Sequence, residues 1–204
     1  MTNKIKPLFH VVLFQPEIPD NTGAIGRTCV GVGAKLWLVR PLGFQIEERR
    51  LKRAGLDYWP NLDWEIVDNW SHLLDRLAED FAEEAREAME CGAACDRTAI
   101  SPAPLEGVSE VSRGNGWARA FPRRMWLLTK RGVADYIQAD LRKGDVFVFG
   151  AESTGLPQEI LDAHPDRCLK IPIQPGIRCL NLSVSVGVTL FEARRQAYLA
   201  CIGG

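Results

Sequence analysis

The feature that most restricts how this chain folds is a set of short runs of apolar, β-branched and aromatic residues. Loops and helical patterns separate these runs. Residues 8–14 read LFHVVLF, residues 35–40 read KLWLVR and residues 145–149 read DVFVF, and each run has the length of a buried strand. A loop with proline and glycine follows the first run, and a helical pattern at 24–32 precedes the second. This alternation predicts an α/β fold, a parallel sheet with helices on both faces.

The rest of the chain continues the alternation. Asn21 or Thr22 is expected to cap the helix at 24–32, because short polar side chains accept backbone hydrogen bonds at helix starts. We expect further strands at residues 63–67, 124–129 and 168–173, helices at residues 46–54, 71–91, 158–164 and 182–199, and a short helix or turn at 136–141.

The size and composition favour one domain. The chain has 204 residues, of which 46% are hydrophobic and 25% charged, ordinary values for a globular protein with a substantial core. After the long helix, Gly, Ser, Pro, Arg and Ala dominate and large apolar residues become rare. We therefore expect a single domain over residues 1–204 with an inserted loop at about 83–120.

Membrane association and a metal centre are not expected. No apolar run approaches the ~18 residues that a membrane span needs, and no cleavage site follows the apolar stretch near the N-terminus. We expect a cytoplasmic protein whose six cysteines stay reduced. Cys91 and Cys95 lie four residues apart, but two further zinc ligands are missing nearby, so structural thiols are favoured.

The net charge of −1 hides an uneven distribution. Residues 75–90 hold seven acidic side chains and two basic ones, so the rest of the chain is mildly basic. The densest basic cluster consists of Arg49, Arg50, Lys52 and Arg53. Such a cluster suits contacts to nucleic-acid phosphates, and a solvated helix face explains it equally well.

The first candidate segment follows the strand at 8–14 and contains Asn21, Gly23 and Arg27. Gly23 lets a ligand approach the backbone closely, because glycine has no side chain. Arg27 projects from the first turns of the helix, where its planar guanidinium suits a phosphate. A salt-bridged surface arginine is the alternative interpretation.

The second candidate segment, residues 149–157, reads FGAESTGLP and places two glycines and Glu152 directly after a buried strand. Parallel α/β proteins bind ligands at the carboxyl ends of strands. Gly150 and Gly155 would let backbone groups face a cofactor. The segment matches neither the GxGxxG fingerprint nor the Walker loop, and a tight turn is the structural alternative.

The third candidate segment joins residues 171–173, IPI, to residues 178–183, RCLNLS. Asn181 and Ser183 can cap the last helix and also present polar groups to a site. For either residue alone, an ordinary cap is the favoured interpretation. Other enzyme classes find little support, since the three histidines are scattered and no GxSxG nucleophile motif is present.

Together and in this order, these segments resemble the SpoU–TrmH branch of the SPOUT class of RNA 2′-O-methyltransferases. The resemblance covers residues 8–70 and 121–198 and is greatest for the short TrmL type, which methylates the wobble nucleotide, position 34, of tRNA. The matching stretches are LFQPEIPDNTGAIGRTC from residue 13, RRLKRAGLDYW from 49, FGAESTGLP from 149 and IPIQPGIRCLNLSVSVGVTLFEARRQ from 171.

The resemblance implies S-adenosylmethionine as the cofactor, S-adenosylhomocysteine as its product, and no metal. It also implies a deep trefoil knot in the C-terminal segment and a homodimer whose active site is shared across the interface, with the helix from Leu182 as a dimer face. The residues that would contact the cofactor are Leu128, Thr129, Gly150, Glu152, Gly155, Ile171, Ile173, Cys179 and Leu180.

The implied reaction transfers a methyl group to a ribose hydroxyl, a poor nucleophile that must lose a proton. The resemblance assigns this step to Arg27, although a guanidinium with a pKa above about 12 does not readily accept a proton. Arg27 therefore acts either as a base in the complex or, as we favour, by positioning phosphate and stabilising the developing alkoxide. Asn181 is the second expected catalytic residue. Contacts to tRNA are expected from Asn21, Arg49, Arg50, Arg53, Tyr58 and Arg178.

Two features depart from the family pattern. Cys179 stands where these enzymes usually have serine, and the short members lack the insertion near 83–120. Two alternatives remain open at this point: a SPOUT methyltransferase for another tRNA position or for ribosomal RNA, and an RNA-binding protein without catalysis. The intact Arg27, Asn181 and glycine loops argue against the second alternative.

Overall fold

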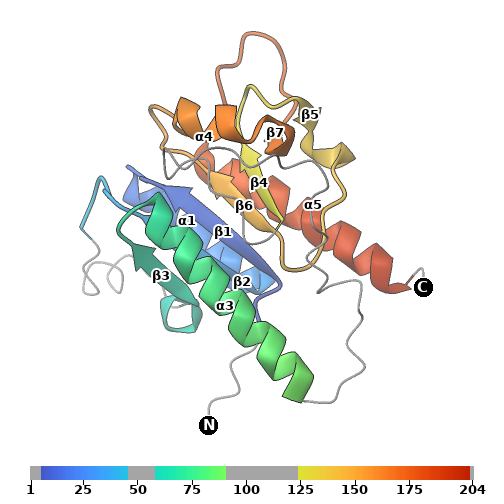
Figure 1. Ribbon diagram of the computed structural model, residues 1–204. Coiled ribbons are helices and arrows are strands. Elements are labelled where there is room, and N and C mark those ends of the chain that lie inside the picture. Colours follow the sequence, from blue (N-terminus) through green and yellow to red (C-terminus); the bar gives the residue numbers. More distant parts are fainter. Residues whose placement is uncertain (1–5, 46–57, 91–123, 203–204) are drawn as a thin grey trace.

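The computed structural model describes residues 6–45, 58–90 and 124–202, which form a parallel sheet between two layers of helices (Figure 1). The predicted basic helix at 46–54 lies outside the described residues, as do residues 91–120 of the predicted insertion. Residues 83–90, where we expected the insertion to begin, are the last turns of a long helix.

Seven strands pair in the order β3-β2-β1-β6-β4-β7-β5, and every pairing is parallel. The strands are β1 (Phe9–Phe14), β2 (Ala34–Val39), β3 (Trp64–Val67), β4 (Met125–Leu128), β5 (Ala134–Asp135), β6 (Val146–Phe149) and β7 (Cys168–Lys170). The α-helices are α1 (Pro19–Val32), α3 (Trp70–Glu90), α4 (Gln158–Ala163) and α5 (Leu182–Ile202), and short 3-10 helices are η1 (Trp59–Asn61), η3 (Tyr136–Gln138) and η4 (Pro165–Arg167).

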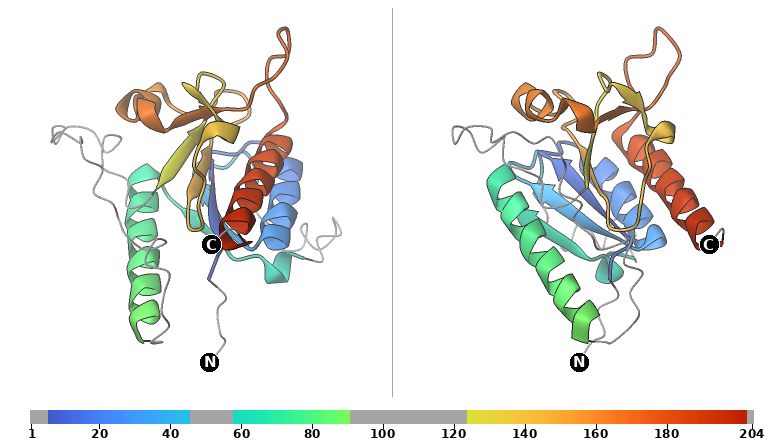
Figure 2. Two further views of the ribbon diagram at one scale, coloured as in Figure 1. Left: turned by 90° about the vertical axis from the view of Figure 1, so that its right-hand side faces the viewer. Right: turned by 45° about the vertical axis from the view of Figure 1, so that its right-hand side comes forward.

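Helices cover both faces of the sheet, as Figure 2 shows from the side. Successive side chains of a strand point to opposite faces. In β1, Phe9, Val11 and Leu13 pack in the layer with α1 and α5. Val12 and Phe14 pack in the layer with α3 and α4. All six residues of β1 are buried, as expected for a parallel sheet covered on both sides, and the predicted α/β fold is confirmed.

Helix α1 begins at Pro19, five residues before the predicted start. Its N-cap is Ile18, which makes no side-chain capping hydrogen bond, and the prediction that Asn21 or Thr22 caps the helix is wrong because both lie inside it. Proline suits the first turn of a helix, where its missing N–H group needs no partner. The helix ends as expected at Gly33, whose φ of 81° is left-handed.

Two strands differ from the sequence expectation. Strand β7 ends at Lys170, before the predicted end at Ile173, and Pro172 cannot donate a hydrogen bond to a neighbouring strand. Strand β5 has only two residues at the edge of the sheet and was not predicted, because it contains no apolar run.

The register of the sheet brings the carboxyl ends of four neighbouring strands together. Leu13 of β1 and Leu128 of β4 both pair with Phe149 of β6. Leu128 also pairs with Leu169 of β7. The three candidate segments follow β1, β6 and β7, so they meet at one edge of the sheet, where open α/β folds bind ligands.

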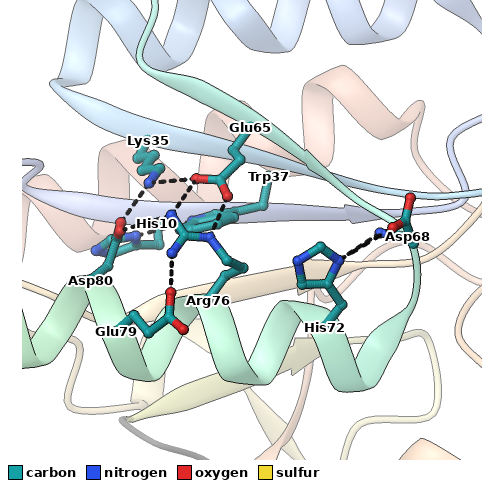
Figure 3. A network of polar contacts seen from close by, with 9 residues as sticks. All are labelled: His10, Lys35, Trp37, Glu65, Asp68, His72, Arg76, Glu79 and Asp80. Carbon is teal, nitrogen blue, oxygen red and sulfur yellow. Dashed lines mark hydrogen bonds and ion pairs between the residues drawn. The ribbon is translucent and has the colours of Figure 1, made fainter.

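A polar network lies between β2, β3 and α3, on the opposite face of the sheet from α1 and α5 (Figure 3). Lys35 is 2% exposed, and its Nζ lies 2.5 Å from Asp80 Oδ2 and 3.2 Å from Glu65 Oε2. The same Nζ lies 3.9 Å from the ring centre of Trp37, and Arg76 Nε donates to Glu65 Oε1 over 2.6 Å. Burial opposes ionisation of Glu65, but the hydrogen bonds from Arg76 and Lys35 outweigh it and lower its pKa. The network therefore fastens α3 to two strands.

Candidate cofactor and RNA site

A cavity of about 760 Å³ opens at the carboxyl edge of the sheet, between the loops after β1, β4, β6 and β7 and the start of α5. Asn21, Arg178 and Asn181 line it, as do all nine residues that the resemblance assigns to the cofactor: Leu128, Thr129, Gly150, Glu152, Gly155, Ile171, Ile173, Cys179 and Leu180. Three segments far apart in sequence thus form one site.

Basic side chains that the sequence analysis did not select lie at the same cavity. Lys130 and Arg131 are exposed and line it, directly after β4. Arg131 Nη1 donates to Gln158 Oε1 at the start of α4 over 3.1 Å. Their position directly after a predicted strand was the sequence signal that could have identified them as site residues. With Arg178 they give the cavity a positive rim that suits a polyanion.

The carboxylate of Glu152 joins the second segment to the first. Its Oε2 accepts the backbone N–H of Glu17 over 2.9 Å, and its Oε1 accepts that of Ile18 over 3.3 Å. Asn21 Nδ2 also donates to Oε1 over 2.9 Å. A carboxylate here satisfies amides at the start of α1 and interacts favourably with the helix dipole. Glu152 therefore takes the role expected of a local capping residue.

The side chain of Glu17 adds a reciprocal link. Ser153 donates to it twice, from its backbone N–H over 2.9 Å and from its hydroxyl over 2.6 Å. The loop after β6 and the start of α1 therefore hold each other through two carboxylates.

The third segment connects through a pair of amides. Asn181 Nδ2 donates to Oδ1 of the buried Asn21 over 2.9 Å. Asn181 Oδ1 in turn accepts the backbone N–H of Ser183 over 2.8 Å and its hydroxyl over 2.6 Å. Asn181 thus holds the start of α5 as a helix cap does, and the interpretation of Asn181 as a cap is confirmed.

The glycines of the second segment make a tight turn. Gly155 has a φ of +75° and Ala151 bridges to it. A Cβ at Gly150 would lie 2.1 Å from the carbonyl carbon of Gly155, a backbone clash. Gly150 is therefore required for the turn itself, which places the residues between the glycines along the cavity.

Arg27 lies apart from the cavity of its own chain. Arg27 comes six residues after Asn21 and therefore points to a different side of α1. Arg27 is not among the described residues that line the cavity. Its side chain is exposed, and its Cζ lies 4.8 Å from the ring centre of Tyr58. The structure does not bring the two expected catalytic residues, Arg27 and Asn181, to the same side of the helix.

Among the other expected RNA contacts, Arg49, Arg50 and Arg53 lie outside the described residues. Tyr58 is buried against α1, and its hydroxyl donates to the carbonyl of Gly23. Its position supports a role within the chain, and the RNA contact expected of Tyr58 stays a prediction.

Cysteines and metal ligands add no further site among the described residues, and Cys91 and Cys95 lie outside them. Cys29 and Cys168 are buried free thiols, and Cys179 and Cys201 are exposed free thiols. In the ranges that the structure covers, no three His, Cys, Asp or Glu side chains lie close enough to hold a metal ion. Across the same ranges, no helix is long and apolar enough to cross a membrane.

Comparison with known proteins identifies the family. The SpoU rRNA Methylase family matches residues 8–95 and 108–191. The chain belongs to this family. A relative from Methylovorus glucosotrophus (strain SIP3-4), named tRNA (cytidine(34)-2′-O)-methyltransferase, is 39% identical over 190 residues, covering 93% of this chain and 96% of its own length. A Bacillus subtilis (strain 168) relative, named a putative tRNA (cytidine(34)-2′-O)-methyltransferase, is 36% identical and covers 92% of each chain.

Solved structures agree with membership of the SpoU methylase family. A structure described as giving insights into the 2-OH methylation of C/U34 on tRNA is 37% identical, with a TM-score of 0.66, over 92% of this chain and 95% of its own. AviRb from Streptomyces viridochromogenes, a SpoU methyltransferase in complex with AdoMet, is 20% identical, with a TM-score of 0.64, over 94% of this chain and 59% of its own. The AviRb structure shows a likeness of fold. The family match and the named relatives confirm the resemblance inferred from sequence.

Proposed function

We propose that this protein transfers a methyl group from S-adenosylmethionine to the ribose 2′-hydroxyl of the wobble nucleotide, position 34, of tRNA. The observation that carries this is a near full-length match, 39% identical, to a protein named for that reaction. Within the structure, the three motif segments meet around one cavity and are joined by the hydrogen bonds of Glu152 and Asn181.

The cavity fits the cofactor in size and lining. Its volume of about 760 Å³ lies in the usual range for small-molecule sites, roughly 300–1,000 Å³. Leu128, Leu156 and Leu180 provide apolar walls, and the backbone of the 150–155 turn provides donors and acceptors. We propose that these residues, with Thr129, Ile171 and the exposed loop at 173–179, hold S-adenosylmethionine, which supplies a methyl group on a sulfonium.

The acceptor hydroxyl must be brought to the cavity and must lose its proton as it attacks. Arg178, Lys130 and Arg131 give the rim positive charge that would hold the RNA phosphates. As the ribose oxygen bonds to the methyl carbon and the methyl–sulfur bond breaks, the hydroxyl proton passes to solvent water, because a guanidinium donates but does not readily accept a proton. Arg27 stabilises the negative charge that develops on the ribose oxygen and holds an adjacent phosphate. Asn181 keeps the start of α5 and Asn21 in place.

We propose that the active site is shared between two copies of this chain. Arg27 projects away from the cavity of its own chain, so a second copy is needed to bring such an arginine to it. Four exposed apolar residues lie along one side of helix α5, and we call this row the seam: Val184, Phe191, Tyr198 and Ile202. A second copy packed on this seam would cover it.

We also propose that the C-terminal segment is threaded as the deep trefoil knot of the SPOUT class. The segment between β4 and β6 closely contacts both elements that would pass through it. A Cβ at Gly132 would lie 2.3 Å from the carbonyl carbon of Leu169 in β7. The backbone N–H of Leu141 donates to Gln196 Oε1 of α5 over 2.9 Å. A crystal structure whose chain trace reduces to an unknotted line would contradict the knot.

The function is tested with purified protein, methyl-labelled S-adenosylmethionine and tRNA from cells that lack 2′-O-methylation at position 34. We expect label in tRNA, and mass spectrometry of nuclease fragments should locate it at nucleotide 34. Label at another tRNA position, or in ribosomal RNA only, would refute the wobble assignment. Calorimetry that detects no binding at millimolar S-adenosylmethionine would refute the methyltransferase assignment and leave an RNA-binding protein.

A further inference from the structure

Tyr58 begins a short segment, residues 58–62, that packs against α1 beside Arg27. The side chains of Tyr58 and Leu62 are 9% and 7% exposed. Gly26 makes this close packing possible, since a Cβ there would lie 3.1 Å from Leu62 Cδ2 and 3.2 Å from Trp59 Cζ3. The segment is therefore fixed against the turn of α1 that carries Arg27.

Tyr58 contacts this turn in two ways. Its hydroxyl donates to the carbonyl of Gly23, which in an α-helix is the carbonyl that faces the amide of Arg27, four residues later. Its ring lies 4.8 Å from Arg27 Cζ, within the ~6 Å range of cation–π contacts. One buried side chain thus holds both the backbone and the guanidinium of Arg27.

An exposed arginine otherwise samples many rotamers, and ordering it during the reaction costs conformational entropy. A guanidinium that is already held stabilises developing charge without that reorganisation. The flat face of Tyr58 suits the planar guanidinium of Arg27 in a way that it does not suit a lysine ammonium.

We propose that Tyr58 is a positioning residue for Arg27 in the methyl-transfer step. The ring sets the orientation of the guanidinium, and the hydroxyl fixes the helix turn from which Arg27 projects. This proposal rests on the proposed function of Arg27, and it assigns Tyr58 a task inside the chain besides the RNA contact expected from sequence.

The first test compares Tyr58→Phe and Tyr58→Leu in the purified full-length protein. Tyr58→Leu should lower kcat by about tenfold or more, because a misplaced catalytic group loses most of its effect, while the Kd for S-adenosylmethionine stays unchanged. Tyr58→Phe keeps the ring but loses the hydroxyl bond to Gly23, so it should lower kcat by a smaller factor than Tyr58→Leu. Tyr136→Leu on η3, a half-buried tyrosine away from the cavity, is the matched control and should keep wild-type kcat. Wild-type kcat in Tyr58→Leu would overturn the proposal.

A double-mutant cycle separates positioning from general destabilisation. Arg27→Lys keeps a cation but loses the planar fork. If Tyr58 acts through Arg27, Tyr58→Leu lowers kcat much less in the Arg27→Lys background than in the wild type. Equal fold-losses in the two backgrounds would show that Tyr58 acts independently of Arg27.

A third measurement does not depend on activity. The Nε–Hε proton of Arg27 should show a ring-current shift in an NMR spectrum, retained in Tyr58→Phe and lost in Tyr58→Leu. A wild-type protein that shows this shift but methylates no RNA would refute the proposed function and leave the contact standing. Absence of the shift in the wild type would refute the positioning role even in an active enzyme.

Discussion

At the scale of single residues, Glu152 has the widest influence on the candidate site. Its carboxylate contacts Asn21, a residue 131 positions earlier in the chain. The start of α1 depends on this contact, since Glu152 binds the backbone amides of Glu17 and Ile18. The helix start was predicted wrongly for this reason: a local pattern of short polar residues does not reveal a capping group supplied by a distant loop.

Replacement of Glu152 tests this capping role. Glu152→Ala should lower the free energy of unfolding by about 1–3 kcal/mol, because it removes charge-assisted hydrogen bonds and leaves the amides of Glu17 and Ile18, just before α1, without that acceptor. Urea denaturation followed by circular dichroism measures the change. Glu159→Ala, an exposed acid in the first turn of α4, is the control. An equal, small effect of both substitutions would contradict the role of Glu152.

The lowered pKa of Glu65 predicts a specific pH dependence. A carboxyl whose pKa is lower in the folded state stabilises that state above its unfolded pKa of about 4.3, and the stabilisation disappears as the pH falls through the folded pKa. Glu65→Gln should therefore be less stable than wild type at neutral pH, and the difference should shrink below about pH 4.3. Thermal unfolding between pH 3 and 7 measures it. A difference that stays constant over this range would show that ionisation of Glu65 is not involved.

At the scale of helices and strands, hydrophobic pattern was a good guide where the element is buried. The runs at 8–14, 35–40 and 145–149 became β1, β2 and β6, each fully buried. The hydrophobic pattern did not predict a strand that forms only because it pairs with a neighbouring strand. The two residues of β5 are a strand because they pair with β7, and nothing in their own sequence indicates it.

The attachment of α3 to the sheet gives a prediction at this scale. Lys35→Ala should lower the free energy of unfolding by about 1–3 kcal/mol, because it removes the buried cation between Asp80 and Glu65, although both carboxylates keep Arg76 nearby. Lys35→Met combined with Asp80→Leu should recover part of the loss, since an apolar pair needs no counter-charge.

The control for Lys35 is Lys170, whose side chain is 42% exposed and whose Nζ lies 3.7 Å from Asp135. Lys170→Ala should cost no more than about 1 kcal/mol, as exposed ion pairs contribute little. Chemical denaturation measures all three variants. A loss of under 1 kcal/mol for Lys35→Ala would show that the network does not fasten α3.

At the scale of the whole molecule, sequence motifs predicted the cavity but not the placement of Arg27. All nine expected cofactor residues line one cavity, because they lie at or beyond the carboxyl ends of parallel strands that share an edge. The side of α1 that Arg27 occupies depends on how the helix is rotated against the sheet and α5. That rotation comes from packing across the fold, which motif spacing does not contain.

The proposed shared site predicts that dimer disruption stops methyl transfer. Phe191 is 58% exposed on α5, and Phe191→Glu would place a charge in the proposed seam. We expect a monomer in sedimentation velocity experiments, with S-adenosylmethionine binding retained and methyl transfer lost. Ile137→Glu, at a site 51% exposed on η3, should leave both unchanged. A fully active monomer would contradict the shared site.

The strand order also determines how the protein can fold during translation. Strand β6 lies between β1 and β4, so one edge of β1 stays without its native partner until residue 149 has left the ribosome. The cavity needs Asn181 as well, which is synthesised later still. A nascent chain must therefore carry an apolar strand edge through most of its synthesis, and the proposed cofactor site is complete only when the last helix is emerging.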